Sequence, residues 1–236
     1  MKFSFTYKAI AAALVLSLGF LSCSKLDRDY EPVQVSGLNV IHASPTIELL
    51  DVYVDNSRAT VSDFEFGNKI GYLSAYSGNR AFNVTKKGNS TSLKSLTYNL
   101  KPQLGYSLFV ANTLANIELL MLEDDLAKPA AGKVKIRFVN LSPDGGNLSL
   151  NVDGAATDLA TNKAFKEFSA FEAVDATTGT QSVTLNIKNA TSGAVEATIP
   201  GVKLEEGKIY TVYAKGLKAG TGDMGFSAKM FLHSNN

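Results

Sequence analysis

The chain has 236 residues, with 23 basic side chains against 22 acidic ones and a single cysteine. This near balance, without any acidic or basic block, gives no electrostatic case for binding nucleic acid. One cysteine excludes a disulfide within the chain. Two units of about 100 residues each can nevertheless bury enough apolar surface to fold without one.

The first 22 residues predict a secretion signal. Lys2 and Lys8 give a positive start, and Ala9–Leu21 is almost wholly apolar. A helix of that length measures about 20 Å against a hydrocarbon core of about 30 Å. This is typical of the apolar region of a signal peptide. We therefore expect residues 1–22 to be removed and no later segment to span a membrane.

Phe20-Leu21-Ser22 leads directly into the only cysteine, Cys23. This step resembles the lipoprotein cleavage site in the looser form of Bacteroidetes. The resemblance implies cleavage before Cys23 and a diacylglycerol on its sulfur, so that the lipid anchors the protein in the outer membrane. The alternative is ordinary secretion with an incidental free thiol.

Residues 23–36 are polar and contain Pro32, which predicts an extended tether. Lys25, Asp27 and Asp29 loosely resemble the acidic export signal of Bacteroidetes surface lipoproteins, although Leu26 and Arg28 interrupt the acidic run. The cell surface is accordingly favoured over the periplasmic face.

Residues 37–126 predict a first β domain, because apolar and polar residues alternate in short runs. Turn residues such as Asp55-Asn56 and Ser77-Gly78-Asn79 separate these runs. The predicted strands are Leu50–Asp55, Lys69–Tyr76, Arg80–Thr85, Leu93–Leu100, Tyr106–Asn112 and Ile117–Leu122. A linker is predicted at 127–132.

Residues 133–236 predict a second domain that repeats the first. Ser44-Pro45 recurs as Ser142-Pro143, and Val54-Asp55 recurs as Val152-Asp153 at the same spacing. An ungapped repetition of this kind indicates a duplicated structural unit. Asp153-Gly154 predicts a hairpin turn.

Two further patterns occur in the second unit. Lys133, Lys135 and Arg137 alternate with apolar residues, and we interpret this basic row as one solvated strand face rather than a binding patch. Thr157–Glu167 has no clear period, and a helical turn is one interpretation.

Seven or eight short strands in about 100 residues, with turns between them, favour a β-sandwich. A closed barrel fits less well, because the irregular spacing indicates crossing connections. We expect an all-β fold: two tandem antiparallel β-sandwich domains, immunoglobulin- or transthyretin-like, after a lipoprotein signal peptide.

Three segments, LNVIHASP at 38–45, LDVYVD at 50–55 and GYLSAYSG at 71–78, resemble the domain-of-unknown-function family 4397. The resemblance covers Leu38 to about Leu122. The second unit resembles a divergent copy, with Asn140-Leu141 in place of His42-Ala43. The resemblance implies a secreted or lipid-anchored β-sandwich, often in tandem, and brings no catalytic residues.

His42 is the first candidate for chemistry. It shares a strand face with Leu38 and Val40, and Asn140 holds the matching place in the second unit. We interpret both as hydrogen-bonding braces for the backbone before the Ser-Pro step; metal binding or catalysis at His42 is the alternative. The other histidine, His233, has no evident partner in the sequence.

Carboxylate pairs are the second class of candidate. Asp51 and Asp55 lie four residues apart on one strand face, about 13 Å, whereas the acid pairs of glycosidases are about 5–9.5 Å apart. Asp124-Asp125 and Glu205-Glu206 are interpreted as solvated. Asp144-Gly145-Gly146-Asn147 is interpreted as a hairpin turn rather than a calcium loop. No catalytic, cofactor or metal site is therefore predicted.

These observations lead to three hypotheses. The first is a non-catalytic lipoprotein that acts as a binding, adhesion or scaffold module with a protein or glycan ligand. The second is an accessory glycan-binding surface lipoprotein, for which Tyr53, Tyr72 and Tyr76 are the candidate stacking residues, with a structural role as the alternative. The third is a hydrolase of unrecognised type.

Overall fold

The computed structural model describes residues 32–233. The predicted leader 1–22 and the predicted lipid site Cys23 lie outside these residues. Residues 34–233 belong to one compact unit, and the described part is built from strands and two short 3-10 helices. No helix within 32–233 is long and apolar enough to cross a membrane.

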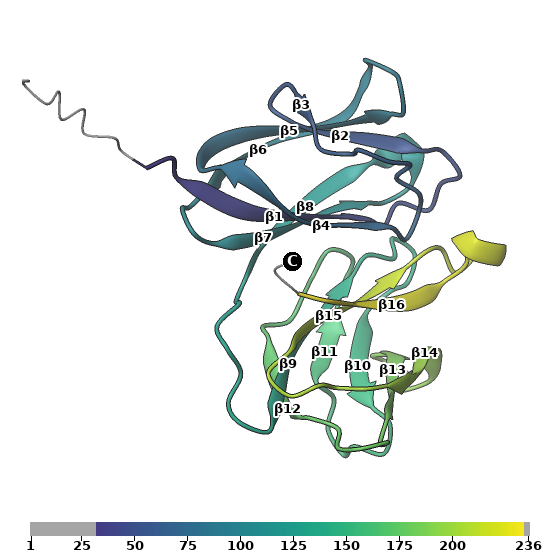
Figure 1. The fold of residues 1–236 in the computed structure, drawn as a ribbon. Coiled ribbons are helices and arrows are strands. Elements are labelled where there is room, and N and C mark those ends of the chain that lie inside the picture. Colours follow the sequence, from purple (N-terminus) through teal and green to yellow (C-terminus); the bar gives the residue numbers. More distant parts are fainter. Residues whose placement is uncertain (1–31, 234–236) are drawn as a thin grey trace, which may run out of the picture. The chain divides into compact units, whose positions relative to one another are not determined.

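Eight strands form the first repeat and lie in two layers (Figure 1). The sheets have the strand orders β4-β1-β7-β8 and β3-β2-β5-β6. The elements are β1 Val35–His42, β2 Leu50–Val54, β3 Ser57–Arg58, β4 Lys69–Tyr76, β5 Gly78–Lys86, β6 Ser92–Leu100, β7 Gly105–Ala111, η1 Leu114–Asn116 and β8 Glu118–Asp124.

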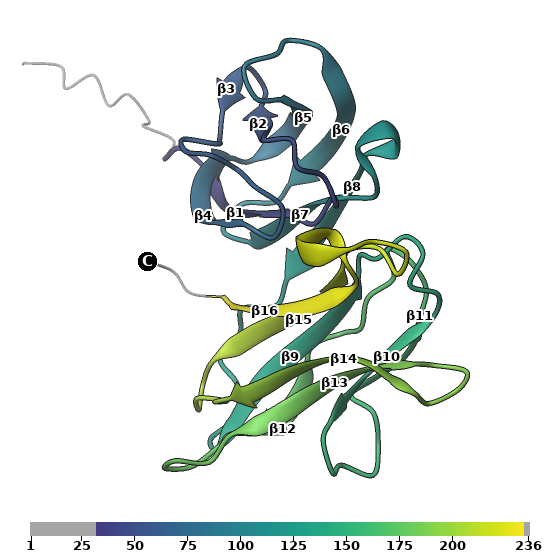
Figure 2. The same ribbon diagram turned by 90° about the vertical axis from the view of Figure 1, so that its right-hand side faces the viewer.

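Eight further strands form the second repeat, again as two sheets (Figure 2). Their orders are β12-β9-β15-β16 and β11-β10-β13-β14. The elements are β9 Lys133–Asn140, β10 Leu148–Val152, β11 Ala160–Lys163, β12 Glu172–Asp175, β13 Val183–Asn189, β14 Val195–Val202, β15 Ile209–Lys215, η2 Gly222–Met224 and β16 Ser227–Leu232.

The two repeats have the same strand order, which confirms the duplication inferred from the Ser-Pro and Val-Asp repeats. The all-β sandwich class is confirmed, with one refinement. Strands β1 and β7, and likewise β9 and β15, pair in parallel, while the other paired strands are antiparallel. Immunoglobulin sandwiches place their first two strands in one sheet. Here β1 and β2 lie in different sheets, so the transthyretin-like alternative remains.

Each repeat encloses its own apolar core between its two sheets. Leu38, Val52 and Phe82 belong to the first core, and Ile136, Leu150 and Val212 to the second. A third cluster contains residues of both repeats, which the sequence did not predict. Its buried members are Ile41, Ala43, Phe109, Ala111, Leu122, Val139, Leu141, Tyr213 and Phe231. The predicted domain limits 37–126 and 133–236 stay a prediction, because both repeats lie within one compact unit.

A tyrosine fixes the same corner in both repeats. The Tyr106 hydroxyl accepts a hydrogen bond from the Lys101 backbone N–H at 3.0 Å, and the Tyr210 hydroxyl accepts one from the Glu205 N–H at 3.1 Å. In immunoglobulin sandwiches a tyrosine corner satisfies the backbone in a similar way. The backbone amide beside a buried ring is thereby paired in each copy.

Two local interpretations of the second repeat were wrong. Thr157–Glu167 contains the strand β11 rather than a helical turn, because Ala160 and Lys163 pair with β10. The Asp144–Asn147 segment is not a hairpin turn, because β9 and β10 belong to different sheets. The turn at Asp153-Gly154 is confirmed, since it leads from β10 towards its antiparallel partner β11 and Gly154 has φ +77°.

Candidate functional site

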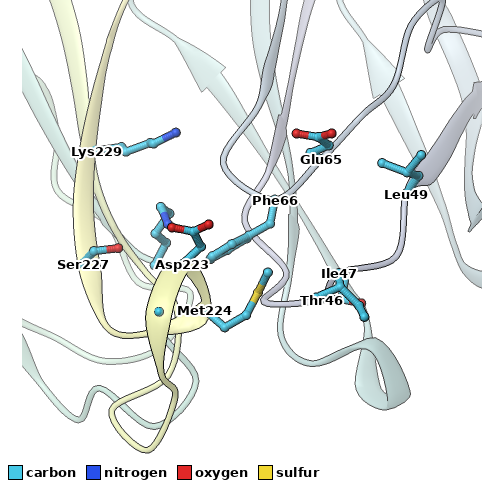
Figure 3. A pocket seen from close by; sticks show the side chains of 11 residues that line it. Thr46, Ile47, Leu49, Glu65, Phe66, Asp223, Met224, Ser227 and Lys229 are labelled. Carbon is cyan, nitrogen blue, oxygen red and sulfur yellow. The ribbon is translucent and has the colours of Figure 1, made fainter.

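A pocket of about 500 Å³ lies between loops of the first repeat and the last strands of the second. We call it the junction pocket. Figure 3 shows Ser227 and Lys229 on one side, Ile47 and Leu49 on the other, and Phe66 between them. The lining residues are Thr46, Ile47, Leu49, Glu65, Phe66, Lys215, Gly222, Asp223, Met224, Ser227 and Lys229.

A tight turn after β15 places η2 at the junction pocket. The Leu217 N–H donates to the Met224 carbonyl at 2.9 Å and closes the loop. Gly216, at φ +82°, makes this turn possible, since a Cβ there would lie 2.1 Å from the Gly225 carbonyl oxygen. Glycine is therefore the residue that both the φ angle and the contact require.

Lys215 brings a buried ammonium to the pocket wall. Its residue is 6% exposed, and its Nζ lies 3.9 Å from the centre of the Phe66 ring. Burial, together with the nearby charge of Lys229, lowers the pKa of Lys215 to about 8, and Asp223 opposes the shift. Among the described residues, no hydrogen bond or ion pair reaches the Lys215 Nζ, so the ring face is its main stabilising contact.

The opposite wall is partly apolar and open to solvent. Ile47 follows the Ser44-Pro45 step and is 88% exposed, while Phe66 and Met224 are half-buried. The backbone N–H of Gly67 donates to the His42 carbonyl at 2.7 Å and holds the Phe66 loop against the end of β1. The pocket is therefore framed by loops on paired strands.

His42 lies beneath this loop and outside the pocket. Its ring is fully buried against Phe64 and Phe66, with centroid distances of 5.2 and 6.3 Å. Burial lowers its pKa to about 4, and the Glu48 main chain opposes this shift without completing a hydrogen bond. The predicted hydrogen-bonding brace is therefore wrong for His42, because apolar rings surround the imidazole.

Asn140 does act as the predicted brace. Its amide donates to the carbonyls of Gly146 and Lys163, both at 2.9 Å, and its oxygen accepts the Ser142 N–H at 3.1 Å. These bonds satisfy the backbone where β9 leaves its sheet. The two repeats thus stabilise the same strand end in different ways. His42 does so by contacts with aromatic rings, and Asn140 does so by hydrogen bonds.

A buried polar ring joins the two repeats. Arg137 Nη2 lies 2.7 Å from Asp124 Oδ1, and the Tyr72 hydroxyl lies 2.6 Å from Asp124 Oδ2. His233 Nδ1 lies 2.7 Å from Tyr72, and its Nε2 lies 2.7 Å from Thr211. Arg137 Nε then donates to Thr211 Oγ1 at 3.2 Å and closes the ring.

The donors and acceptors of this ring fix the state of His233. Because the Tyr72 hydroxyl donates to Asp124, its oxygen accepts the proton on His233 Nδ1, and Nε2 accepts from Thr211. This assigns a neutral imidazole protonated at Nδ1. Burial lowers the pKa of His233 to about 4, which agrees with the neutral form, although Asp124 opposes the shift.

Three predictions about these residues were wrong. His233 has hydrogen-bonding partners, since it belongs to the ring. Asp124 is 4% exposed rather than solvated, whereas its neighbour Asp125 is exposed. Arg137 is 2% exposed rather than part of a solvated face, because Asp124 pairs with it and Phe171 stacks on it at 4.5 Å.

The remaining acids have separate partners. Asp51 is buried and accepts from Thr60, while Asp55 is exposed and pairs with Arg80. Asp144 accepts backbone N–H groups of Lys218 and Ala219 at 2.8 and 3.3 Å. Glu205 and Glu206 are exposed as predicted. Within residues 32–233, no group of three His, Cys, Asp or Glu residues is placed to hold a metal.

The three tyrosines proposed for sugar stacking differ in accessibility. Tyr72 has its hydroxyl occupied in the polar ring. Tyr76 is 63% exposed on β4. Tyr53 is half-buried and lines a small polar pocket of about 280 Å³ on the β2-β5 sheet. The other lining residues are Asp55, Asn56, Asn83, Thr85, Asn89 and Ser90.

The family model for a domain of unknown function, DUF4397, matches residues 36–151. This part of the chain matches the DUF4397 family. The DUF4397 match runs past Leu122, where the resemblance in the sequence ended, and includes β9 and β10. Both Ser-Pro steps therefore lie inside it. Among curated proteins, none matches this chain.

Some solved structures are weakly similar to this chain. A family 26 carbohydrate-binding module of Eubacterium rectale Amy13K, solved with maltoheptaose, is 10% identical, with 85% of this chain and 98% of that chain covered and a TM-score of 0.28. An α-glucan-binding streptococcal virulence factor is 10% identical, with 77% and 92% covered and a TM-score of 0.26. Family 41 carbohydrate-binding modules from streptococcal virulence factors are 12% identical, with 84% and 88% covered and a TM-score of 0.25. TM-scores this low do not establish a shared fold, so no ligand is transferred.

The junction pocket could not be found in the sequence. Lys215 and Lys229 lie on β15 and β16, whereas Phe66 belongs to a loop of the first repeat. The packing of the two repeats brings these residues together.

Proposed function

We propose that the protein is a non-catalytic binding module of the cell envelope, held by lipid at Cys23, and that it captures its ligand in the junction pocket. The observation that carries this proposal is the open pocket with Ile47, 88% exposed, at its wall. Loops on a rigid β scaffold are common positions for binding residues. Pockets also occur preferentially where two folded units meet.

The scaffold around the pocket supports this role. The shared apolar cluster with Phe109 and Phe231, together with the Arg137–Asp124 pair, connects the two repeats. Lys166 and Glu118 form a further ion pair between them. Because residues on both sides of the pocket are held by these contacts, a ligand would meet a preformed site and little ordering entropy would oppose binding.

Neither histidine favours the hydrolase alternative. His42 is fully buried and His233 is 9% exposed. A nucleophilic mechanism needs a base within reach of the substrate, and both rings are enclosed by aromatic neighbours. The accessible chemistry at the junction pocket is instead that of charged and apolar contacts.

Photo-cross-linking in cells tests the binding role. A photoreactive residue in place of Ile47 should give a specific cross-linked product, because that side chain borders the pocket. The same residue in place of Val195, which is 51% exposed on β14, is the matched control. Equal products at both positions, or none at Ile47, would contradict the proposed site.

Metabolic labelling with a fatty acid tests the anchor separately. We expect the full-length chain to incorporate label and to fractionate with membranes, and Cys23→Ser to lose both properties. A single acyl chain binds a membrane only weakly. A diacylglycerol on Cys23 would supply two chains, so we expect the fatty-acid label in this group. A Cys23→Ser chain that still carries label would exclude this anchor.

Glycan capture is a second candidate function, favoured by the Tyr53 pocket. An aromatic ring beside Asn83, Asn89 and Asp55 offers both stacking and hydrogen-bonding groups to a sugar. Glycan-array binding should fall on Tyr53→Ala and persist on Tyr76→Ala, the exposed control on β4. A blank array with the full-length protein would remove this candidate.

A further inference from the structure

Two lysines of the second repeat end beside one glycine of the first. A Cβ added at Gly67 would lie 2.8 Å from the Lys229 Nζ and 3.6 Å from the Lys215 Cε. The Lys229 Nζ donates to the Gly67 carbonyl at 3.0 Å. Two ammonium groups therefore share one wall of the junction pocket.

These ammonium groups have no carboxylate within ion-pair distance among residues 32–233. Lys215 is the more buried of the two and rests on Phe66. Like charges placed close together and partly buried disfavour their own charged forms. The lowered pKa of Lys215 agrees with this arrangement. An anion in the pocket would reduce the repulsion between the two ammonium groups and would stabilise the charged form of the buried Lys215.

The rest of the lining limits the kind of anion. Phe66, Met224 and Ile47 supply an apolar surface. Glu65 and Asp223 also line the pocket, and their negative charges oppose a ligand of high negative charge such as a phosphate. A single negative charge attached to an apolar body satisfies both parts of the lining.

We propose that the junction pocket binds a carboxylate attached to an apolar group, with the carboxylate at Lys215 and Lys229 and the apolar group against Phe66, Met224 and Ile47. This inference rests on the proposed function of the same pocket and names its ligand class. A peptide C-terminus and a free aliphatic or aromatic acid share this chemistry.

Calorimetric titration of the full-length protein with matched probes tests the class without any variant. The small-molecule probes are 4-phenylbutyrate and 4-phenylbutyramide. The peptide probes are N-acetyl-Leu-Phe with a free carboxylate and with a C-terminal amide. We expect at least one acid to bind about tenfold or more tightly than its amide, the order of one charge-assisted hydrogen bond. Binding of the peptide acid alone assigns the ligand to a chain terminus, and binding of phenylbutyrate alone assigns it to a free acid.

Variants test the position of the carboxylate. Lys215→Met keeps a flexible side chain on Phe66 but removes one of the two charges, so the preference for acid over amide should fall, and it should disappear when Lys229→Met is added. Lys203→Met is the control, because Lys203 is exposed and does not line the pocket. Equal affinity of the unaltered protein for acid and amide, or an acid preference that Lys215→Met leaves unchanged, overturns the inference.

Failure of this inference differs from failure of the proposed function. A specific cross-link at Ile47 combined with no binding of any acid would keep the pocket as a ligand site and exclude this ligand class. No cross-link and no acid binding would exclude both. Acid binding that Lys215→Met weakens supports both together.

Discussion

The carboxylate of Asp124 at the end of β8 and the guanidinium of Arg137 in β9 lie 2.7 Å apart, and both side chains are buried. Asp124 belongs to the first repeat and Arg137 to the second. The ion pair therefore spans the linker and ties the two copies of the sandwich together. Phe171, Tyr72 and His233 exclude water around it.

Breaking this pair should destabilise the protein strongly. Arg137→Met leaves the Asp124 carboxylate buried without its cation, which costs about 3–5 kcal/mol in free energy of unfolding. Urea denaturation measures the change. The exposed pair of Lys133 and Asp175 is the control, where Lys133→Ala should cost less than about 1 kcal/mol. A double variant, Asp124→Leu with Arg137→Met, should recover part of the loss; if it is no more stable than Arg137→Met, the buried charge is not the cause.

Stability should fall as the pH drops below 6.5. The pKa values of His42 and His233 are lowered from 6.5 to about 4 by burial. Between these values the unfolded chain binds protons that the folded chain does not, so the free energy of unfolding decreases with falling pH. The loss reaches about 3 kcal/mol for each histidine near pH 4. Denaturation at pH 7 and pH 4.5 measures it.

Two histidine variants separate the contributions to this pH dependence. His42→Leu removes a ring without hydrogen bonds and should keep the stability at pH 7 within about 1 kcal/mol. His233→Leu breaks two hydrogen bonds of the polar ring and should cost about 2 kcal/mol at pH 7. Each variant should show a shallower loss between pH 6.5 and 4. An unchanged slope would assign the pH dependence to the carboxylates.

The two corner tyrosines should contribute equally to stability. Tyr106→Phe and Tyr210→Phe each remove one hydrogen bond to a backbone N–H and should cost about 0.5–1.5 kcal/mol. Chemical denaturation compares both with Tyr98→Phe, whose half-buried ring packs edge to face against Tyr106. A loss confined to one repeat would show that the duplicated corner no longer has one role.

Gly216 should tolerate no side chain. Gly216→Ala places a Cβ 2.1 Å from the Gly225 carbonyl oxygen and must displace the η2 loop. Gly201→Ala is the matched control, because its φ is also positive, +67°, but its surroundings are open. We expect about 1 kcal/mol from the strained φ alone at Gly201 and a larger loss at Gly216. If thermal unfolding shows the same loss of stability for both variants, the η2 loop can move away from the new Cβ without a loss of free energy.

Periodicity predicted most of the strands because each half-buried strand alternates polar and apolar residues. Lys69–Tyr76 is β4 with the predicted bounds. The strand β14, Val195–Val202, was not predicted, because Pro200 and Gly201 interrupt its pattern. An edge strand tolerates proline, and β14 lies at the edge of its sheet.

The sequence could not predict how the two repeats pack against each other. Alternation places Lys133, Lys135 and Arg137 on one face of β9. In a single sandwich this face would point away from the core, so the sequence predicts that it is exposed to solvent. Contacts from the first repeat bury the Arg137 end of this row, whereas Lys133 is 39% exposed. The junction pocket was missed for the same reason, because Phe66 and Lys215 come together only through this packing.

The shared cluster around Phe109 and Phe231 also limits how this gene could be rearranged. A chain cut in the linker would leave Ile41, Phe109 and Tyr213 in water, and such an apolar patch promotes aggregation. Neither copy can therefore be transferred alone to another gene. Recombination that inserted or deleted a single copy would produce a protein with an exposed apolar surface that aggregates. Each copy therefore depends on the other to stay soluble.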